Sequence, residues 1–358
     1  MNTIPTTFND ILPSYTAVGG TERKASTGLS AVILNRGGRY QRHGLFEELG
    51  KAGFDYIISM EGSVTRYDLE SLSRDFPFVR FILLKEIVSP GEEINIAAAE
   101  LSSPLFFVLW NDLRILRGGG AERMAERLLS PGTNAETKSG YKRLCTVPLI
   151  QDGRAETMPT LITPALISEK KSVPSIKTIP FFARSEGLPS LYPFDGIGVY
   201  DRKRFIRLGG FDPSIKSFHW QLMDFGFRSR LWGEKIAATQ LIKLTYEGAV
   251  PQKDGTAESG YKRFFLKNLA PVFRGDYAHI PLRRFPWYFR KMGSDFSAAW
   301  EEFSAAREWV KINRYRFTSD ARTIVERWES MDVPSGETEA LAEKDEAPQA
   351  NTVPEDTK

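Results

Sequence analysis

The chain has 358 residues, 41% of them hydrophobic and 26% charged, and its formal net charge is +3. This composition is that of an ordinary globular protein and excludes general disorder. Such a small net charge over this length does not favour nucleic acid as a partner. Cys145 is the only cysteine, which excludes an intramolecular disulfide and cysteine-rich zinc sites and is compatible with a reducing cytosol.

No targeting or membrane-spanning pattern is visible in the sequence. Residues 1–15 lack the basic segment and apolar core of a secretory signal. No run approaches the roughly 18 apolar residues that a membrane-spanning helix needs. We therefore expect a cytoplasmic protein that does not cross a membrane.

The first part of the chain alternates between short apolar runs and helical periodicity. Residues 1–28 are rich in Thr, Ser, Gly and Pro, and we expect them to form an irregular lead-in. The alternation that follows predicts a parallel sheet with right-handed crossovers. The predicted strands are residues 31–34, 56–58, 79–84 and 106–112, and the predicted helices lie around residues 45–52, 69–72 and 94–101.

This alternation breaks down after residue 112. Residues 130–195 carry many Pro, Thr and Ser residues between short apolar pieces, which predicts a mixed region of short strands. From residue 334 the tail is acidic and lacks aromatic residues, so we expect it to be disordered. The other predicted elements are helices at residues 121–129, 202–208, 221–231, 297–309 and 318–328, a strand at 197–200 and a last core segment at 241–246.

One apolar run stops on a carboxylate. Residues 106–112 read Phe-Phe-Val-Leu-Trp-Asn-Asp, which predicts a buried strand with Asp112 at its end. Open α/β sheets bind ligands at the carboxyl ends of their strands, so an acid here is a candidate metal ligand. Asp224 lies farther along in an apolar, helical stretch, where its ionisation can be tuned. Two separated acids of this kind suggest one site.

Six segments of the sequence match one protein family in that family's own order. They are residues 31–36, 56–63, 91–99, 106–112, 196–212 and 224–232. Together they resemble family 2-type glycosyltransferases of the GT-A fold, in the nucleotide-diphospho-sugar transferase superfamily. This resemblance implies an α/β fold with a Rossmann-type, mostly parallel sheet flanked by helices. The expected regions are a lead-in (1–28), a glycosyltransferase domain (29–255), a helical, basic and aromatic extension (256–332) and a disordered acidic tail (333–358).

The resemblance implies that the first two strand ends hold the nucleotide of a sugar donor. The candidate ligands are Asn35, Arg36, Glu61, Asn95 and Asn111. Carboxylate and amide groups suit ribose hydroxyls and base edges, which offer paired donors and acceptors. The structural alternative is that Asn35 and Glu61 only form turns and that Asn95 only starts a helix.

The family's metal motif is a DxD-like pair of acids. Here Trp110 stands in place of the first acid, whereas Asp112 keeps the second, which is usually the direct ligand. A hard cation, Mg²⁺ or Mn²⁺, would bridge Asp112 and the donor diphosphate and neutralise the charge on the leaving group. Many relatives carry a His farther on, where this chain has Glu247, which is either a further oxygen ligand or an exposed loop acid.

Asp224 matches the acid that the family uses as general base in inverting transfer. Such a carboxylate takes the proton of the acceptor hydroxyl on the sugar face opposite the diphosphate. The alternative is that Asp224 pairs with Arg228 four residues on, a common helix contact. His219 and Trp220, just before it, either line an acceptor pocket or simply pack.

The sequence therefore predicts an inverting, metal-dependent glycosyltransferase that acts on a hydroxyl of a glycan or lipid-linked glycan. Two alternatives are a catalytically silent sugar-nucleotide-binding or scaffold protein, suggested by Trp110 and the missing His, and a sugar nucleotidyltransferase, suggested by residues 31–39. Ser-His-Asp hydrolases and P-loop proteins are excluded by their missing motifs.

Residues 261–291 interleave basic and aromatic side chains. This mixture suits a peripheral contact with anionic lipid headgroups on the inner face of a membrane, or a polyanionic acceptor. The alternative is that these residues are the solvated faces of packed helices.

Overall fold

The computed structural model describes residues 13–22, 26–36, 42–62, 69–129, 142–166, 176–247, 259–292 and 295–329. The predicted disordered tail, residues 333–358, lies outside this set. The expected irregular lead-in is wrong in part, because β1 (Tyr15–Gly19) is a strand that pairs with β4 in antiparallel fashion. Its side chains are mostly exposed, so it lacks the apolar pattern from which a strand is predicted.

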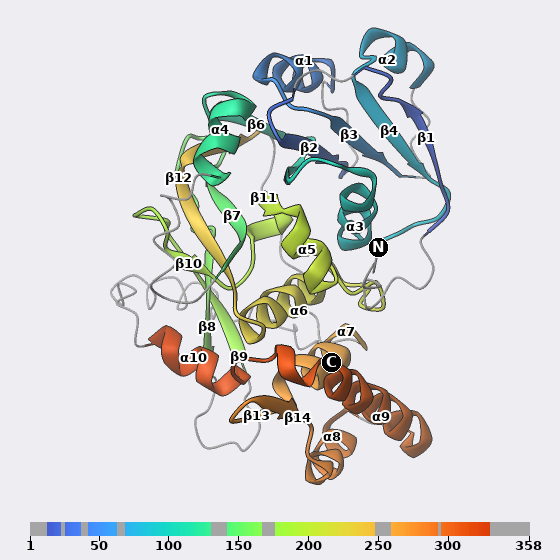
Figure 1. Cartoon of the computed structure of the whole chain (residues 1–358), viewed down its shortest axis with the longest axis vertical. Helices are drawn as coiled ribbons and strands as arrows, with labels where there is room; N and C mark the ends of the chain where they lie inside the picture. Colours follow the sequence, from blue (N-terminus) through green and yellow to red (C-terminus); the bar gives the residue numbers. More distant parts are fainter. Residues whose placement is uncertain are drawn as a thin grey trace, which may run out of the picture.

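Four parallel strands form the first half of the sheet, in the order β4-β3-β2-β5. The chain runs from β2 outward to β3 and β4, then returns to the other side of β2 as β5 (Figure 1). All residues of β2, β3 and β5 are buried, as expected for strands covered on both faces. The strands are β2 (Leu29–Leu34), β3 (Ile57–Glu61), β4 (Val79–Leu84) and β5 (Leu105–Trp110), and the helices that connect them are α1 (Arg42–Ala52), α2 (Leu69–Asp75) and α3 (Pro90–Glu100).

The second half of the sheet is mixed. After β5 the order continues β11-β7-β12-β10, and only β7 and β12 pair in parallel. β6 pairs with β12, which completes a ten-stranded sheet, whereas β8 and β9 form a separate hairpin. The α/β class with a central, partly parallel sheet is thus confirmed. These strands are β6 (Leu113–Arg117), β7 (Lys142–Gln151), β8 (Leu161–Leu166), β9 (Ile176–Phe181), β10 (Pro189–Ser190), β11 (Gly198–Asp201) and β12 (Glu234–Tyr246).

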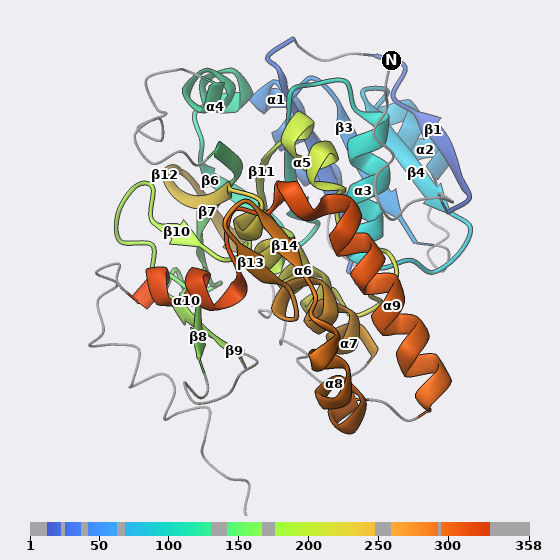
Figure 2. The same ribbon diagram turned by 60° about the horizontal axis from the view of Figure 1, so that its bottom comes forward.

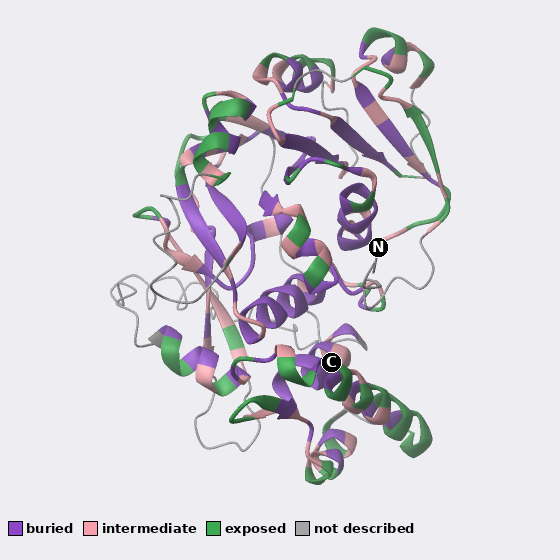
Figure 3. Cartoon of the chain, viewed as in Figure 1, coloured by how far each residue is buried: buried purple, intermediate pink, exposed green. Residues whose placement is uncertain are grey.

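Helix α6 (Phe218–Leu231) lies at the centre of the molecule. Every residue from Trp220 to Leu231 is buried, which Figure 3 shows as a continuous purple ribbon. A helix buried on all sides is normally apolar throughout, but α6 carries Asp224, Arg228 and Arg230. These charges therefore need buried partners. The other helices of this part are α4 (Gly120–Leu129) and α5 (Arg202–Leu208).

The C-terminal part packs against α6 as a group of helices around a short hairpin (Figure 2). The aromatic side chains of residues 261–291 mostly point inward, and Phe264 and Phe265 are each 1% exposed. Among the described residues, no helix is long and apolar enough to span a bilayer. The elements are α7 (Ser259–Phe264), η4 (Phe265–Leu269), β13 (Val272–Arg274), β14 (Tyr277–His279), η5 (Leu282–Arg284), α8 (Phe285–Met292), α9 (Phe296–Asn313), η6 (Arg314–Arg316) and α10 (Ala321–Glu329).

Candidate functional site

The sheet order makes the carboxyl ends of β2 and β5 a topological switch point. The connections from these neighbouring strands leave in opposite directions, and open α/β sheets bind ligands at such a switch point. Asn35 and Arg36 follow β2, and Asn111 and Asp112 follow β5. The Asn111 N–H donates to the Leu34 carbonyl at 2.9 Å, and the Arg36 N–H donates to Asn111 Oδ1 at 3.4 Å. Four of the predicted site residues thus lie together in what we call the strand-end site.

Arg36 occupies the middle of the strand-end site. Its guanidinium forms ion pairs with Asp112, at 3.4 Å from Nε to Oδ2, and with Asp195 through Nη2. The same guanidinium lies 3.9 Å from the ring centroid of Trp110, a cation–π distance. Trp110, at the position of the family's first acid, therefore supports an arginine rather than a metal ligand.

Asp195 also belongs to the strand-end site, and no sequence pattern predicted it. Its backbone is left-handed, with φ of 55°, and its carbonyl accepts a bond from the Trp110 indole at 2.9 Å. Tyr246 donates its hydroxyl to Asp195 Oδ2 at 3.1 Å. Burial raises the pKa of Asp195 to about 6, in spite of the opposing effect of Arg36. Backbone conformations of this kind in non-glycine residues are enriched at ligand sites.

Three buried polar atoms of the strand-end site have no hydrogen-bond partner within the described chain. They are Asn35 Oδ1, Arg36 Nε and Asp112 Oδ1, although Arg36 Nε keeps its ion-pair contact with Asp112. Burial also raises the pKa of Asp112. Leaving a buried polar group unpaired costs about 1–3 kcal/mol. Asn35 Oδ1 and Asp112 Oδ1 are left in this state at two adjacent strand ends, which indicates that this site is built to hold a polar ligand.

The side chains as arranged do not fit a metal ion. No group of three or more His, Cys, Asp or Glu residues within the described ranges could hold one. Arg36 lies between the carboxylates of Asp112 and Asp195. The backbone N–H of Glu247 donates to the Asp112 carbonyl at 2.8 Å, but its side chain is 38% exposed and pairs with Arg114 at 2.9 Å. Asp112 and Glu247, the predicted metal ligands, are therefore neighbours that face two different arginines.

Glu61 lies at the end of β3, beside the strand-end site. Its carboxylate accepts two bonds from Arg42 Nη1, at 2.7 and 2.8 Å, and one from Ser59 at 2.8 Å, so it is more than a turn residue. The Asn35 amide donates to the Met60 carbonyl, which links the ends of β2 and β3. Burial, together with the charge of Glu61, raises the pKa of Glu93 to about 8, so Glu93 is mostly protonated at neutral pH.

Asn95 lies away from these contacts. Its Oδ1 accepts from the Phe211 N–H at 2.9 Å, and its amide donates to the Phe211 carbonyl at 2.8 Å. These two bonds fix α3 to the loop between α5 and α6. The contacts of Asn95 therefore support a structural role, and the nucleotide role stays a prediction.

Asp224 is completely buried in a network of charges. Its Oδ2 accepts from Arg228, at 2.8 and 3.1 Å, and its Oδ1 contacts Lys267 at 2.9 Å and accepts from Asn268 at 2.8 Å. Against the desolvation that burial imposes, Arg228 and Lys267 hold the pKa of Asp224 well below its usual range. Lys267 also contacts the buried Asp212 at 2.9 Å. We call these five residues the α6 charge network.

This geometry disagrees with a general-base role for Asp224. A general base needs hydrogen-bond reach to the acceptor and a pKa near the working pH. Asp224 has 0% exposure, both of its oxygens are engaged, and it is held as a carboxylate. The contact with Arg228 four residues on is the structural alternative that the sequence allowed.

His219 and Trp220 begin the buried part of α6. Trp220 is 8% exposed and packs against Tyr261 and Phe264, with ring centroids 4.9 and 5.6 Å away. His219 meets the edge of Trp220 at 4.8 Å. Trp220 thus joins α6 to α7 by packing, and acceptor binding by either residue stays a prediction.

The residues that sequence reasoning missed are Asp195, Tyr246 and Arg114. Asp195 is followed by Gly196, which only signals a turn, and 159 positions separate it from Arg36. The only related signal in the sequence was Trp110, which departs from the metal motif; its contact with Arg36 is seen only in the structure.

The fold is similar to that of several solved structures. A structure of GalNAc-T7 with UDP, GalNAc and Mn²⁺ aligns with a TM-score of 0.48 and 12% identity, over 80% of this chain and 57% of that one. TarS from S. aureus aligns with a TM-score of 0.39 and 10% identity, over 80% and 55%. TarS 1–349 in complex with UDP-GlcNAc aligns with a TM-score of 0.38 and 10% identity, over 78% and 79%. This chain thus spans little more than half of the first two structures.

Comparison of the sequence itself gives no assignment. No family model matches the chain, and no curated protein matches it significantly.

Proposed function

We propose that the strand-end site binds a nucleotide-diphosphate sugar and that the chain transfers the sugar to a hydroxyl of a glycan or lipid-linked glycan. The observation that carries this proposal is the set of buried atoms without a hydrogen-bond partner, on Asn35, Arg36 and Asp112, at the switch point of the sheet. The order of the six sequence segments supports the same reading.

Each group of the site suits one part of such a donor. Arg36 presents a planar fork of donors, which matches the oxygens of a diphosphate. Asn35 offers a free amide oxygen to a ribose hydroxyl or a base edge.

The charge of the diphosphate has two possible sources of compensation. Arg36 and Arg114 already supply two cations at the ends of β2 and β5. The predicted Mg²⁺ or Mn²⁺ ion would have to compete with Arg36 for the carboxylate of Asp112. We therefore assign the neutralisation of the diphosphate charge to Arg36.

The chemistry of transfer is less well supported than donor binding. Asp224 is sealed in the α6 charge network, so we assign it no part in proton removal. This same observation, with Trp110 in place of an acid, favours the second candidate function, a sugar-nucleotide-binding module without turnover.

Thermal-shift measurements with a panel of sugar nucleotides test donor binding. UDP-GlcNAc, the ligand named for the TarS complex, is one probe, and each probe is measured in EDTA and in Mn²⁺. A ligand that binds only the folded state raises Tm, so at least one probe should stabilise the protein in EDTA. Arg36→Gln should weaken binding at least tenfold, about 1.4 kcal/mol. Arg36→Lys should lie between, because it keeps the charge and loses the fork.

Arg123→Gln is the matched control, because Arg123 is an exposed cation on α4. It should bind like the wild type. No stabilisation by any probe, or equal binding by Arg36→Gln and the wild type, would contradict the proposal. Donor consumption in the presence of acceptor glycans then separates the two candidates, since tight binding without turnover identifies the silent module.

A further inference from the structure

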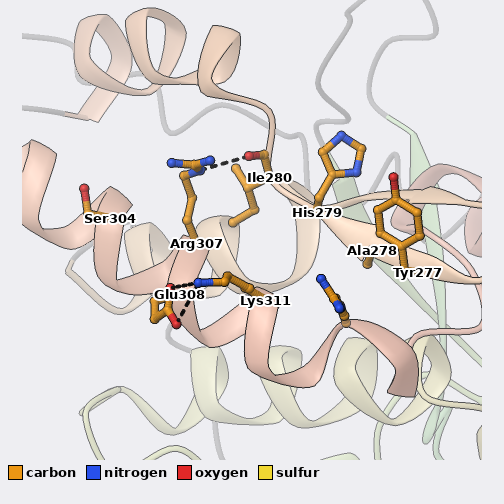
Figure 4. Close-up of a pocket in the computed structure, with 9 residues that line it drawn as sticks. Tyr277, Ala278, His279, Ile280, Ser304, Arg307, Glu308 and Lys311 are labelled. Carbon is orange, nitrogen blue, oxygen red and sulfur yellow. Dashed lines mark hydrogen bonds and ion pairs between the residues drawn. The ribbon is translucent and has the colours of Figure 1, made fainter.

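A second pocket lies in the C-terminal part, built from residues that the strand-end site does not use. It has a volume of about 530 Å³ and lies between the β14 strand with its following residue, 277–280, and the last two turns of α9 with η6 (Figure 4). We call it the hairpin pocket. Its lining shares no residue with the strand-end site.

Three cations line one wall of the hairpin pocket. Arg307, Lys311 and Arg314 follow one another at intervals of four and three residues, which places them on one face of the helix. Arg307 Nε donates to the Ile280 carbonyl at 3.1 Å, which fixes that guanidinium against the opposite wall (Figure 4). The hydroxyl of Ser304 adds a neutral hydrogen-bonding group to the same wall.

These charges are poorly compensated within the pocket. The only acid in its lining is Glu308, which contacts Lys311 at 3.2 Å with side chains that are 59% and 69% exposed. An ion pair so exposed contributes little to stability and leaves the lysine available to a ligand. The lining therefore carries three positive side chains and one negative side chain.

The surroundings add further positive charge. Burial and then Arg274, Arg284, Arg283 and Arg307 lower the pKa of His279, which lies in the pocket wall. Its Nδ1 is buried and has no hydrogen-bond partner within the described chain. A neutral imidazole with an unused nitrogen, among arginines from three elements, marks a place where an anion would be stabilised.

We propose that the hairpin pocket is a binding site for a phosphate group, a phosphomonoester or a diphosphate. Arginine forks and a lysine suit phosphate oxygens, and the volume admits such a group with part of the molecule that carries it. The phosphate belongs either to a soluble ligand or to a lipid headgroup. Leu282, Phe296 and Trp300, which are 53%, 60% and 43% exposed, lie on neighbouring elements of this region and would suit the second source.

The test uses the full chain and follows His279 directly, so that binding at the strand-end site does not interfere. Imidazole resonances are recorded by NMR during titration with inorganic phosphate and pyrophosphate, and the His279 signal is identified by its loss in His279→Gln. A saturable shift of this signal is expected in the wild type. Lys311→Gln/Arg314→Gln should weaken the response at least tenfold. Lys51→Gln/Arg123→Gln, which removes two exposed cations from α1 and α4, should not change it.

The source of the phosphate is identified by sedimentation with vesicles of phosphatidic acid in phosphatidylcholine, against phosphatidylcholine alone. The proposal is supported if phosphate titration or vesicle sedimentation shows binding that Lys311→Gln/Arg314→Gln loses and Lys51→Gln/Arg123→Gln keeps. Tighter binding to the soluble anion or to the phosphatidic acid vesicles identifies the source of the phosphate. Absence of saturable binding in both arms overturns the proposal. So does equal binding by the wild type and the Lys311→Gln/Arg314→Gln variant in a protein with unchanged Tm.

Discussion

The guanidinium of Arg36 is held between two carboxylates whose settings differ. Asp112 follows a regular buried strand, whereas Asp195 lies in a turn with left-handed backbone and needs Trp110 and Tyr246 to hold it in place. Both acids have a raised pKa, because both are buried. The positive charge of Arg36 thus offsets the negative charges of two desolvated acids. A ligand that binds Arg36 changes the pKa of both acids.

Asp195 makes the stability of the protein depend on pH in a defined direction. Its pKa of about 6 lies above the ordinary value of about 3.9, so the folded state binds this proton more tightly than the unfolded state. The stability that protonation contributes is fully present below about pH 4 and is lost as the pH rises through 6. Asparagine cannot ionise, so Asp195→Asn should gain about 2 kcal/mol relative to the wild type between pH 4.5 and pH 8.

Urea unfolding at both pH values measures this difference. Asp276→Asn, at an exposed position in the β13–β14 turn, is the control and should show no such change. A constant difference in unfolding free energy between Asp195→Asn and the wild type would contradict the burial of an ionisable Asp195.

At the scale of elements, the α6 charge network joins α6 to η4, the short helix that follows α7. Lys267 bridges Asp212 and Asp224 at 2.9 Å each, and Asn268 contacts Asp224 from the same short helix. Breaking a buried pair from one side leaves an uncompensated charge and costs about 3–5 kcal/mol. The network therefore couples the C-terminal helices to the sheet region by ion pairs as well as by packing.

Asp224→Asn should therefore destabilise the fold by about 3–5 kcal/mol. In a double-mutant cycle with Lys267→Met, the coupling between the two changes should reach about 1–3 kcal/mol, because both remove parts of one network. Urea unfolding supplies the four free energies. Wild-type stability of Asp224→Asn, combined with loss of sugar transfer, would contradict this account and restore the general-base role.

The elements that the sequence revealed are those with strong periodicity. β4 and α5 match their predicted bounds, and β2, β3 and β5 differ only at their ends, because buried strands are continuous apolar runs. β1 and β6 escaped prediction because their side chains are largely exposed or mixed. The antiparallel pairing of β11 with β5 depends on contacts between distant segments, which no local pattern records.

The part of the strand-end site that follows the ends of buried strands could also be predicted from the sequence. Asn35, Arg36, Asn111 and Asp112 lie together because the strand order fixes where strands end. Asp195 could not be found, because its place depends on the path of a turn far along the chain. The role of Asp224 stays a prediction, because an apolar helix with one acid fits a tuned catalytic group and a buried ion pair equally well, and its contacts favour the ion pair.

At the scale of the whole molecule, two separate polar sites lie in two regions. The strand-end site lies where the parallel half of the sheet meets the mixed half, and the hairpin pocket is lined by residues of β14, α9 and η6. The buried α6 runs between these regions, with the sheet on one side and α7 on the other. Both regions contribute to one hydrophobic core, so a donor in the first site and a phosphate-bearing ligand in the second would share it.

The most direct test of the account is the crystal structure of the protein with UDP. We predict that the diphosphate lies at the carboxyl ends of β2 and β5, within hydrogen-bond distance of the Arg36 guanidinium. The nucleoside should lie toward Asn35 and Glu61. UDP bound elsewhere, with Arg36 still paired to Asp112 and Asp195 and the three unpartnered atoms still without a ligand, would contradict it.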